Sequence, residues 1–289
     1  MKLALVDGHN LAFRAFYGMP ALTRGDGFPT GAVHGWVRTI WALEDQIEAD
    51  RMLVFFDLGE PVRHTALAAD YKGTRGETPE ALTQQMPHIR AWTQAMGYGA
   101  IEEDGVEADD LIASCARREA VAGHAVTIVS ADKDLGQLVD GTIRQLLPPP
   151  TANPKLGWRW LDVVAVEEKF GVPPHLIPDY LALVGDASDN IAGLSGVGPK
   201  TAAKWLRAFG SLDGVIAHSG DLTPKRFQAP VHAAQERLRV NLQMTTLDTT
   251  RKTPPLGEVA TDFAKGLAIL SDLEMRGSVE QAKQRYTAG

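Results

Sequence analysis

The chain has 289 residues, of which 44% are hydrophobic, and a formal net charge of -7. This length and composition fit an ordinary globular core, in one large domain or two smaller ones. Apolar runs stay short of the roughly 18 residues of a membrane span, and Asp7 interrupts the first run too early for a signal peptide. We therefore expect a cytoplasmic protein. The single Cys115 excludes an internal disulfide and a cysteine-based zinc site.

Three apolar runs in the first half of the chain are each followed closely by acidic residues. The runs have the aliphatic and aromatic character of buried strands. They are residues 2–6, 51–56 and 125–130, and the acids that follow them are Asp7, Asp57, Asp132 and Asp134. Open α/β sheets bind their ligands at the carboxyl ends of the strands. We expect these carboxylates to share that edge of a sheet.

The segments between these runs have apolar residues at helical spacing, for example residues 32–47. Strands that alternate with helices indicate an α/β fold with a mostly parallel central sheet and helices on both faces. Residues 142–147 are predicted as a further strand, and the prolines of 148–154 as a stiff connector. From residue 163 helices follow one another without a further strong strand. We place a soft boundary there, which divides the chain into regions 1–162 and 163–289.

Glu107, Asp109 and Asp110 put three carboxylates into four residues just before an apolar helical run. Carboxylates this close together repel one another, which destabilises the ionised forms unless the groups take up protons, extend into water or bind a metal ion. Acids also favour the first turn of a helix because of its dipole, so the turn taken alone leaves helix capping and metal binding equally open. The recurrence of acids at the other strand ends favours metal binding.

A helix-hairpin-helix pattern follows two further acids, Asp186 and Asp189. Its glycines permit a tight turn with exposed N–H groups, and Pro199 fits the first position of a helix. Such a helix start suits a DNA phosphate. The residues expected to contact DNA there are Gly196, Gly198, Lys200, Thr201 and Lys204. A nucleotide-binding loop starting at Gly193 is excluded, since position 199 would have to be lysine.

Residues 58–97 are polar and mixed in charge, with an amphipathic helix expected over 79–96. Tyr71 beside Lys72 and Arg75 suits a stacked base and a phosphate backbone. A solvent-exposed helical segment in which Tyr71 packs against its neighbours explains the pattern as well. Arg14 is close enough to Asp7 in sequence to reach a substrate phosphate. A surface arginine without a role is an equally good interpretation.

Taken together, these motifs resemble the 5'-nuclease or flap endonuclease family. The resemblance is to the N-terminal 5'→3' exonuclease domain of bacterial DNA polymerase I and to its stand-alone bacterial and phage relatives, and it covers nearly the whole chain. It implies a PIN-like nuclease core with a helical arch over 58–97. The motifs stand at residues 6–10, 55–57, 71–75, 106–110, 131–135, 185–190 and 196–200.

The resemblance implies two groups of metal ligands, some acting through water. The first group is Asp7, Asp57, Glu107, Asp109 and Asp110, and the second is Asp132, Asp134, Asp186 and Asp189. Ligands that are all oxygen suit Mg²⁺ or Mn²⁺. Without these nine carboxylates the rest of the chain carries a positive charge. The acidic composition is therefore compatible with a nucleic-acid partner.

By the same resemblance Lys72 and Arg75 would hold the scissile phosphate, and two metal ions would hydrolyse it to leave a 5'-phosphate. The expected partner is DNA with a 5' flap or a single-stranded 5' end, with RNA–DNA hybrids as an extension. A K⁺ ion at the hairpin and a monomeric state are also expected.

Two other functions compete with this hypothesis. The first is a catalytically weak DNA-binding or scaffold protein with the same fold and hairpin. The second is a phosphatase that uses Asp7 as its nucleophile. The sequence disfavours the phosphatase, because such enzymes carry a second aspartate where this chain has His9.

Overall fold

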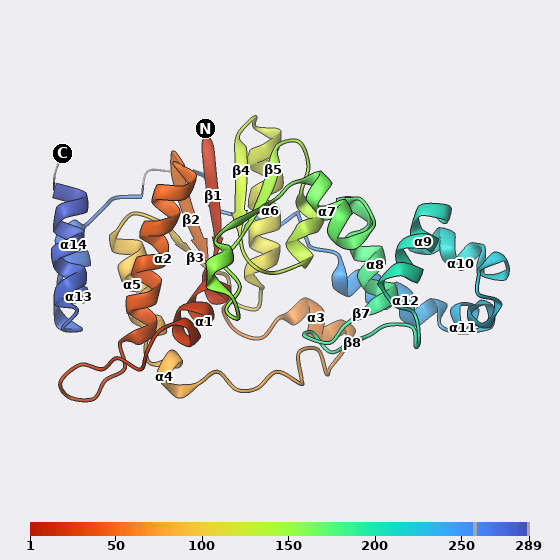
Figure 1. The fold of residues 1–289 in the computed structure, drawn as a ribbon, viewed down its shortest axis with the longest axis horizontal. Coiled ribbons are helices and arrows are strands. Elements are labelled where there is room, and N and C mark those ends of the chain that lie inside the picture. Colours follow the sequence, from red (N-terminus) through yellow and green to blue (C-terminus); the bar gives the residue numbers. More distant parts are fainter. Residues whose placement is uncertain (257–258, 288–289) are drawn as a thin grey trace.

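The computed structural model describes residues 1–256 and 259–287; residues 257–258 and 288–289 of the expected C-terminal region lie outside the described residues. A six-stranded sheet in the order β3-β2-β1-β4-β5-β6 forms one end of the molecule (Figure 1). All neighbouring strands are parallel except β6, which pairs with β5 in the antiparallel sense. The strands are β1 (Lys2–Asp7), β2 (Arg51–Phe55), β3 (Ala100–Ile101), β4 (Ala125–Val129), β5 (Ile143–Leu147) and β6 (Arg159–Leu161).

Strand β1 shows why this sheet is covered on both faces. Leu3 to Val6 are all buried, and their side chains alternate between two hydrophobic clusters. Ala4 and Val6 pack in one cluster, whereas Leu3 and Leu5 pack in the other. The α/β fold with a mostly parallel sheet is confirmed.

The first cluster is covered by helices α1, α2 and α5, and the second by α6, on the opposite face (Figure 1). The helices of this part are α1 (Gly8–Gly18), α2 (Gly31–Ile47), α3 (Val62–Leu67), α4 (Glu80–Thr83), α5 (Met86–Ala95) and α6 (Ala108–Val121). No helix within the described ranges is both long and apolar enough to cross a membrane.

A second hydrophobic core lies at the other end of the molecule, around Leu206, Leu238 and the buried Trp205. It is built from α7 (Val163–Phe170), α8 (Ile177–Val184), α9 (Pro199–Phe209), α10 (Leu212–Ala217), α11 (Gln228–Ala233) and α12 (Gln235–Thr245). The short strands β7 (Gly185–Asp186) and β8 (Ile191–Ala192) form an antiparallel hairpin at its edge. The sequence did not predict this hairpin.

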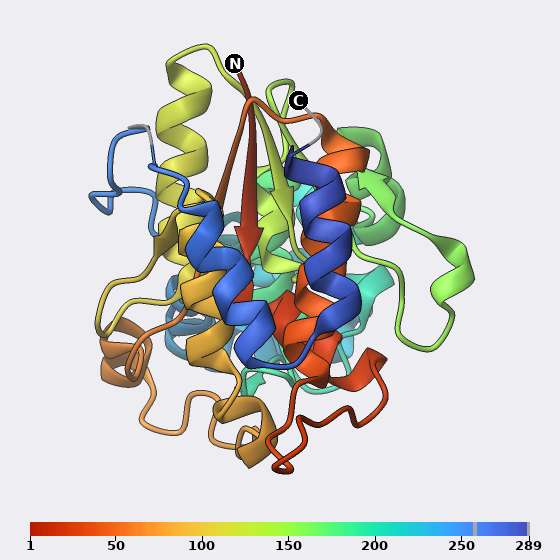
Figure 2. The ribbon, with the colours of Figure 1, turned by 90° about the vertical axis from the view of Figure 1, so that its left-hand side faces the viewer.

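The last two helices, α13 (Phe263–Asp272) and α14 (Arg276–Thr287), return to the first core. Figure 2 shows them against α5 and α2. Leu270 and Leu273 are buried with the residues of α2 and α5, and Arg285 Nε lies 2.6 Å from Glu44 Oε2. Residues 263–287 therefore pack on α5 and α2, which belong to the first core, and not on the rest of the region that begins at 163.

The helix expected over 79–96 is divided into α4 and α5 at Gln84 and Gln85. The side-chain oxygen of Gln85 accepts hydrogen bonds from the backbone N–H of Ala32 (2.7 Å) and Val33 (3.2 Å). It thus satisfies donors at the start of α2, where Thr30 makes no side-chain cap. Helix α5 is part of the core through Ile89 and Trp92, so only the segment before α4 is free to lie over another surface.

Candidate metal and nucleic-acid site

A cleft of about 610 Å³ opens at the carboxyl edge of the sheet. The strand register brings the ends of β1, β2 and β4 level, since Asp7 pairs with Phe55 and Val6 with Val129. The residues lining the cleft are Asp7, His9, Asn10, Phe13, Arg14, Tyr17, Asp57, Lys72, Arg75, Gly76, Thr78, Ala108, Asp109 and Asp132. Four of the expected metal ligands therefore share one cavity with the two expected catalytic cations.

Asp7 is the most enclosed of these carboxylates. Its Oδ1 accepts from the N–H of Asn10 at 3.0 Å, which caps α1, and its Oδ2 accepts from Ser130 Oγ at 2.7 Å. Burial, with a smaller contribution from the charge of Asp57, raises the pKa of Asp7 to about 7. A carboxylate in this state gains from a nearby cation.

Asp109 and Asp132 lie with Asp7 around the same space. Burial and the charges of Asp132 and Asp7 raise the pKa of Asp109 well above its usual range. Burial also raises the pKa of Asp132, whose Oδ1 accepts from the N–H of Asp134 at 2.9 Å. Buried acids that also repel one another are stabilised by a cation between them, so this group is a candidate cation site.

Asp57 is held in place from two sides. Its Oδ1 accepts from the N–H of Ala108 at 2.8 Å, and its own N–H donates to His9 Nδ1 at 2.9 Å. Because Nδ1 is an acceptor, the proton of His9 lies on Nε2 and the ring is neutral; the 3.2 Å approach of Nδ1 to Asp57 Oδ2 is then not an ion pair. Burial lowers the pKa of His9, which agrees with a neutral ring.

A second group of carboxylates consists of Asp134, Asp186 and Asp189, whose oxygens lie within 4.8 Å of one another. Asp134 Oδ1 is buried and has no hydrogen-bond partner among the described residues. Burial and the charge of Asp132 raise the pKa of Asp134 well above its usual range. Lys133 Nζ lies 4.0 Å from this oxygen. A buried oxygen without a hydrogen bond, beside two further carboxylates, fits a metal ligand that binds through oxygen.

Lys133 and Arg75 balance part of this charge. Lys133 Nζ donates to Asp186 Oδ2 at 2.5 Å, and Arg75 Nη2 donates to Asp189 Oδ1 at 2.7 Å. Burial acts to raise the pKa of Asp186, but the hydrogen bonds from Lys133 and Ser188 outweigh it and hold this pKa below its usual value. Sequence reasoning missed Lys133, although it stands between two expected ligands.

The acidic turn is divided between two surroundings. Asp109 lines the cleft, whereas Glu107 is bound by the segment that carries α3. Glu107 pairs with Lys72 Nζ, and its Oε2 lies 2.6 Å from His64 Nδ1. Burial acts to raise the pKa of Glu107, but the hydrogen bond from His64 and the charge of Lys72 hold it at about 2.

Asp110 also points away from the cleft. Its Oδ1 accepts from the N–H of Asp248 at 2.7 Å and lies 3.5 Å from Arg63 Nη1. Arg63 in turn donates to the carbonyls of Gln243 and Thr246, each at 2.7 Å. Asp110 therefore links the base of the 58–79 segment to the end of α12, a structural task that the sequence did not indicate.

Tyr71 does not present its ring to the cleft. The ring is buried, stacked on His64 with centroids 4.6 Å apart, and packed against Ile191 and Met244. Its hydroxyl lies 3.2 Å from Glu107 Oε2 and 3.3 Å from Asp189 Oδ2. The expected stacking on a base is not what this arrangement provides; local packing, the alternative interpretation, describes it.

In the sequence, the glycine hairpin follows shortly after Asp186 and Asp189, two members of the second group of carboxylates. Gly196 has a φ of 78°, which only glycine adopts readily, and α9 begins at Pro199 directly after Gly198. Lys200 and Lys204 are exposed on the first turns of α9. Arg14, by contrast, lies at the cleft and donates from Nη2 to the carbonyl of Pro149.

A parallel sheet with carboxylates along its carboxyl edge, joined to a helical unit that carries a glycine hairpin, defines the class of PIN-like nuclease folds. Comparison with known families agrees over most of the chain. Residues 2–171 match the family model described as 5'-3' exonuclease, N-terminal resolvase-like domain, and residues 172–261 match 5'-3' exonuclease, C-terminal SAM fold. The chain belongs to the 5'-3' exonuclease family.

Individual relatives are of two lengths. A 5'-3' exonuclease of Aquifex aeolicus is 34% identical over 289 residues, which cover 98% of this chain and 96% of that protein. DNA polymerase I of Pseudomonas aeruginosa is 39% identical over 254 residues, but the match spans only 27% of the polymerase. The fold is also that of T5 5'-exonuclease with bound zinc, at a TM-score of 0.71, 22% identity and coverage of 98% and 99%.

Proposed function

We propose that the protein is a structure-specific, metal-dependent 5' nuclease, acting as a 5'→3' exonuclease and 5'-flap endonuclease on DNA. The observation that carries the proposal is the pair of carboxylate groups at the sheet edge, with Lys72 and Arg75 lining the same cleft. Several of these acids have raised pKa values, and one buried carboxylate oxygen accepts no hydrogen bond. Both features favour binding of divalent cations over a purely structural network of ion pairs as the role of the acids.

The residues fit Mg²⁺ or Mn²⁺. The cleft acids Asp7, Asp57, Asp109 and Asp132 would form the first group, and Asp134, Asp186 and Asp189 the second. Glu107 and Asp110 would act from a greater distance, since the protein already engages both carboxylates. When bound, divalent ions supply an activated water and neutralise charge on the phosphate.

Lys72 and Arg75 would hold the scissile phosphate. Both side chains lie in the cleft and are paired with carboxylates, Lys72 with Glu107 and Arg75 with Asp189. A phosphate that enters between them replaces these partners as the acceptor of charge-assisted hydrogen bonds. Attack of water on that phosphorus with loss of the 3' oxygen would break the P–O3' bond and leave a 5'-phosphate on one product and a 3'-hydroxyl on the other.

The DNA duplex would contact the glycine hairpin at the other end of the molecule. The N–H groups around Gly196 and Gly198 and the exposed Lys200, with Thr201 and Lys204 on the same helix, suit a backbone phosphate. A K⁺ ion at the hairpin carbonyls would complete this grip. The segment from 58 to 79 would lie over the single-stranded 5' end, and Arg14 would contact a phosphate inside the cleft.

A labelled 5'-flap duplex, incubated with and without Mg²⁺, tests the proposal. Metal-dependent release of the flap by wild type, absent in Asp109→Asn, is the expected result. The competing function is a catalytically weak DNA-binding protein of the same fold, which would bind the duplex without cutting it in Mg²⁺ or Mn²⁺. A second substrate, in which an RNA strand paired to DNA replaces the flap strand, tests whether the protein also removes RNA primers.

A further inference from the structure

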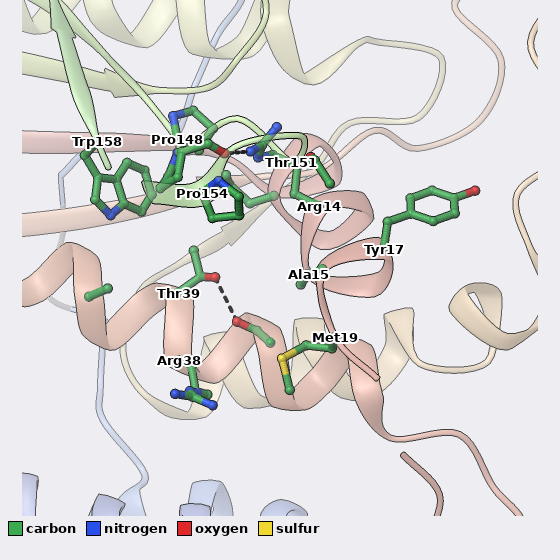
Figure 3. Close-up of a pocket in the computed structure, with 15 residues that line it drawn as sticks. Arg14, Ala15, Tyr17, Met19, Arg38, Thr39, Pro148, Thr151, Pro154 and Trp158 are labelled. Carbon is green, nitrogen blue, oxygen red and sulfur yellow. Dashed lines mark hydrogen bonds between the residues drawn. The ribbon is translucent and has the colours of Figure 1, made fainter. Parts of the chain in front are cut away.

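A second cavity, of about 470 Å³, lies next to the catalytic cleft, between α1, α2 and the proline-rich connector that joins β5 to β6 (Figure 3). Its volume is in the range of small-ligand sites. The residues lining it include Arg14, Tyr17, Arg38, Pro148, Pro154 and Trp158. None of the metal ligands discussed above belongs to it.

The cavity has the form of an apolar slot. In Figure 3 the rings of Pro148 and Pro154 form one wall, α2 with Thr39 forms the opposite wall, and the indole of Trp158 closes one end. Proline rings and an indole present flat apolar faces. A planar aromatic ligand would pack between such walls without needing hydrogen bonds.

Two arginines supply positive charge to the slot. Arg14 donates only to the carbonyl of Pro149, and Arg38 makes no hydrogen bond or ion pair with any residue of the described ranges. No acidic residue is among the described residues that line the cavity. The charge is therefore available to an anionic ligand, and a phosphate is the group that an arginine fork fits best.

The slot is continuous with the catalytic cleft. Arg14 and Tyr17 line both cavities. Tyr17 is 63% exposed and projects outward from α1 (Figure 3). The Tyr17 ring is supported edge-on by Phe16, with centroids 5.1 Å apart. A strand that leaves the cleft thus meets a phosphate-binding cation and an exposed aromatic ring before it reaches the slot.

We propose that this slot is a subsite for one unpaired nucleotide of the DNA substrate, with the base between the prolines and Trp158 and the phosphate at Arg14 and Arg38. Flat apolar walls with arginines in the lining suit single-stranded nucleic acid. The inference rests on the proposed function for the identity of the ligand. Its site, however, lies outside the catalytic carboxylates.

Binding measured without divalent ions tests the subsite independently of cleavage. The probe is a 5'-flap duplex with the fluorescent base 2-aminopurine at single positions around the junction, and the reference is a duplex of the same sequence without unpaired nucleotides. The variants are Trp158→Ala and the exposed Arg38→Ala. Their matched controls are Trp160→Ala, on the outer side of β6 where Arg144 covers the indole at 4.5 Å, and Arg276→Ala on α14.

We expect one probe position to change fluorescence on binding to wild type and to lose that change in Trp158→Ala. Both cavity variants should bind the flap duplex about tenfold more weakly, and the duplex without unpaired nucleotides as wild type does. The controls should match wild type on both. Unchanged flap binding by Arg38→Ala and Trp158→Ala, or equal losses on the two duplexes, would overturn the subsite.

A second copy of this chain is the other candidate occupant. Sedimentation that shows a dimer of wild type, converted to monomer by Arg38→Ala, would also overturn the inference. Failure of the subsite and failure of the nuclease are distinguishable. Wild type that cleaves the flap in Mg²⁺ but shows no effect of the cavity variants refutes the subsite alone.

Discussion

Arg75 Nη2 lies 2.7 Å from Asp189 Oδ1, and the N–H of Lys72 donates to the carbonyl of the same Asp189 at 3.1 Å. Two bonds to one residue thus tie the segment over the cleft to the β7–β8 hairpin. Lys72 itself has a φ of 54°, a left-handed conformation that is uncommon for lysine. The contacts to Asp189 and Glu107 hold Lys72 in this conformation and aim its side chain into the cleft.

Lys72→Ala should lower the turnover of a flap substrate more than it weakens duplex binding. Its ammonium faces the carboxylates at the cleft, whereas the duplex is expected at the distant hairpin. We expect turnover to fall by about 10²- to 10³-fold, the usual effect of removing one charged donor from a transition state. Single-turnover rates and equilibrium binding of the uncut duplex separate the two effects.

Lys225→Ala, an exposed lysine in the second core region, is the matched control and should behave as wild type. If Lys72→Ala changes only the dissociation constant and leaves the single-turnover rate intact, its catalytic role is wrong.

In the absence of metal, neutralising Glu107 and neutralising Asp134 should change the free energy of unfolding in opposite directions. Glu107, with its pKa held at about 2, stabilises the fold when ionised, so Glu107→Gln should lower the free energy of unfolding by about 1–3 kcal/mol near neutral pH. Asp134 has a raised pKa, so its ionised form opposes folding and Asp134→Asn should raise the free energy of unfolding. Urea denaturation in a chelator measures both; shifts of the same sign would contradict the electrostatic assignment.

Stabilisation by Mg²⁺ should increase with pH. In metal-free protein Asp7, Asp109 and Asp134 retain protons that the unfolded chain has already released, so their contribution to stability falls as pH rises above about 4; for Asp7 this fall extends to about pH 7. Mg²⁺ must displace more of these protons at low pH than at high pH. The rise in Tm on adding millimolar Mg²⁺ should therefore be larger at about pH 8 than at about pH 5.5.

The comparison of Tm with and without Mg²⁺ at each pH cancels contributions from titratable groups whose pKa does not change when the metal binds. Asp109→Asn serves as the control and should show a smaller rise that depends less on pH. A rise in Tm that is independent of pH in wild type would argue against metal binding at the acids with raised pKa values.

The sequence predicted the carboxyl edge of the sheet well for a simple reason. Apolar strands that end in an acid are local patterns, and the parallel sheet then brings distant strand ends to the same place. Asp7, Asp57, Asp109 and Asp132 accordingly line one cleft. The sequence did not predict strands β3 and β6, because they have only two and three residues, too few to show the alternation or apolar run of a strand.

Contacts between distant segments were beyond local reasoning. The division of the 79–96 helix depends on Gln85 capping α2, about 50 residues away in sequence. The burial of Tyr71 depends on His64, Ile191 and Met244, which come from three separate segments. In the same way α13 and α14 pack on α5 and α2, because these two helices leave an apolar surface that no pattern within α13 reveals.

We propose that the carboxylates of the cleft hold the divalent ions with which the protein cleaves DNA. The most direct test measures the rate of flap release by wild type and Asp109→Asn in Mg²⁺ and in a chelator, with Glu103→Gln, an exposed acid near the same turn, as the control. Loss of several kcal/mol of charge stabilisation predicts a fall of about 10³-fold or more for Asp109→Asn, with DNA binding retained. Equal rates for Asp109→Asn and wild type, or cleavage that persists in the chelator, would contradict the account.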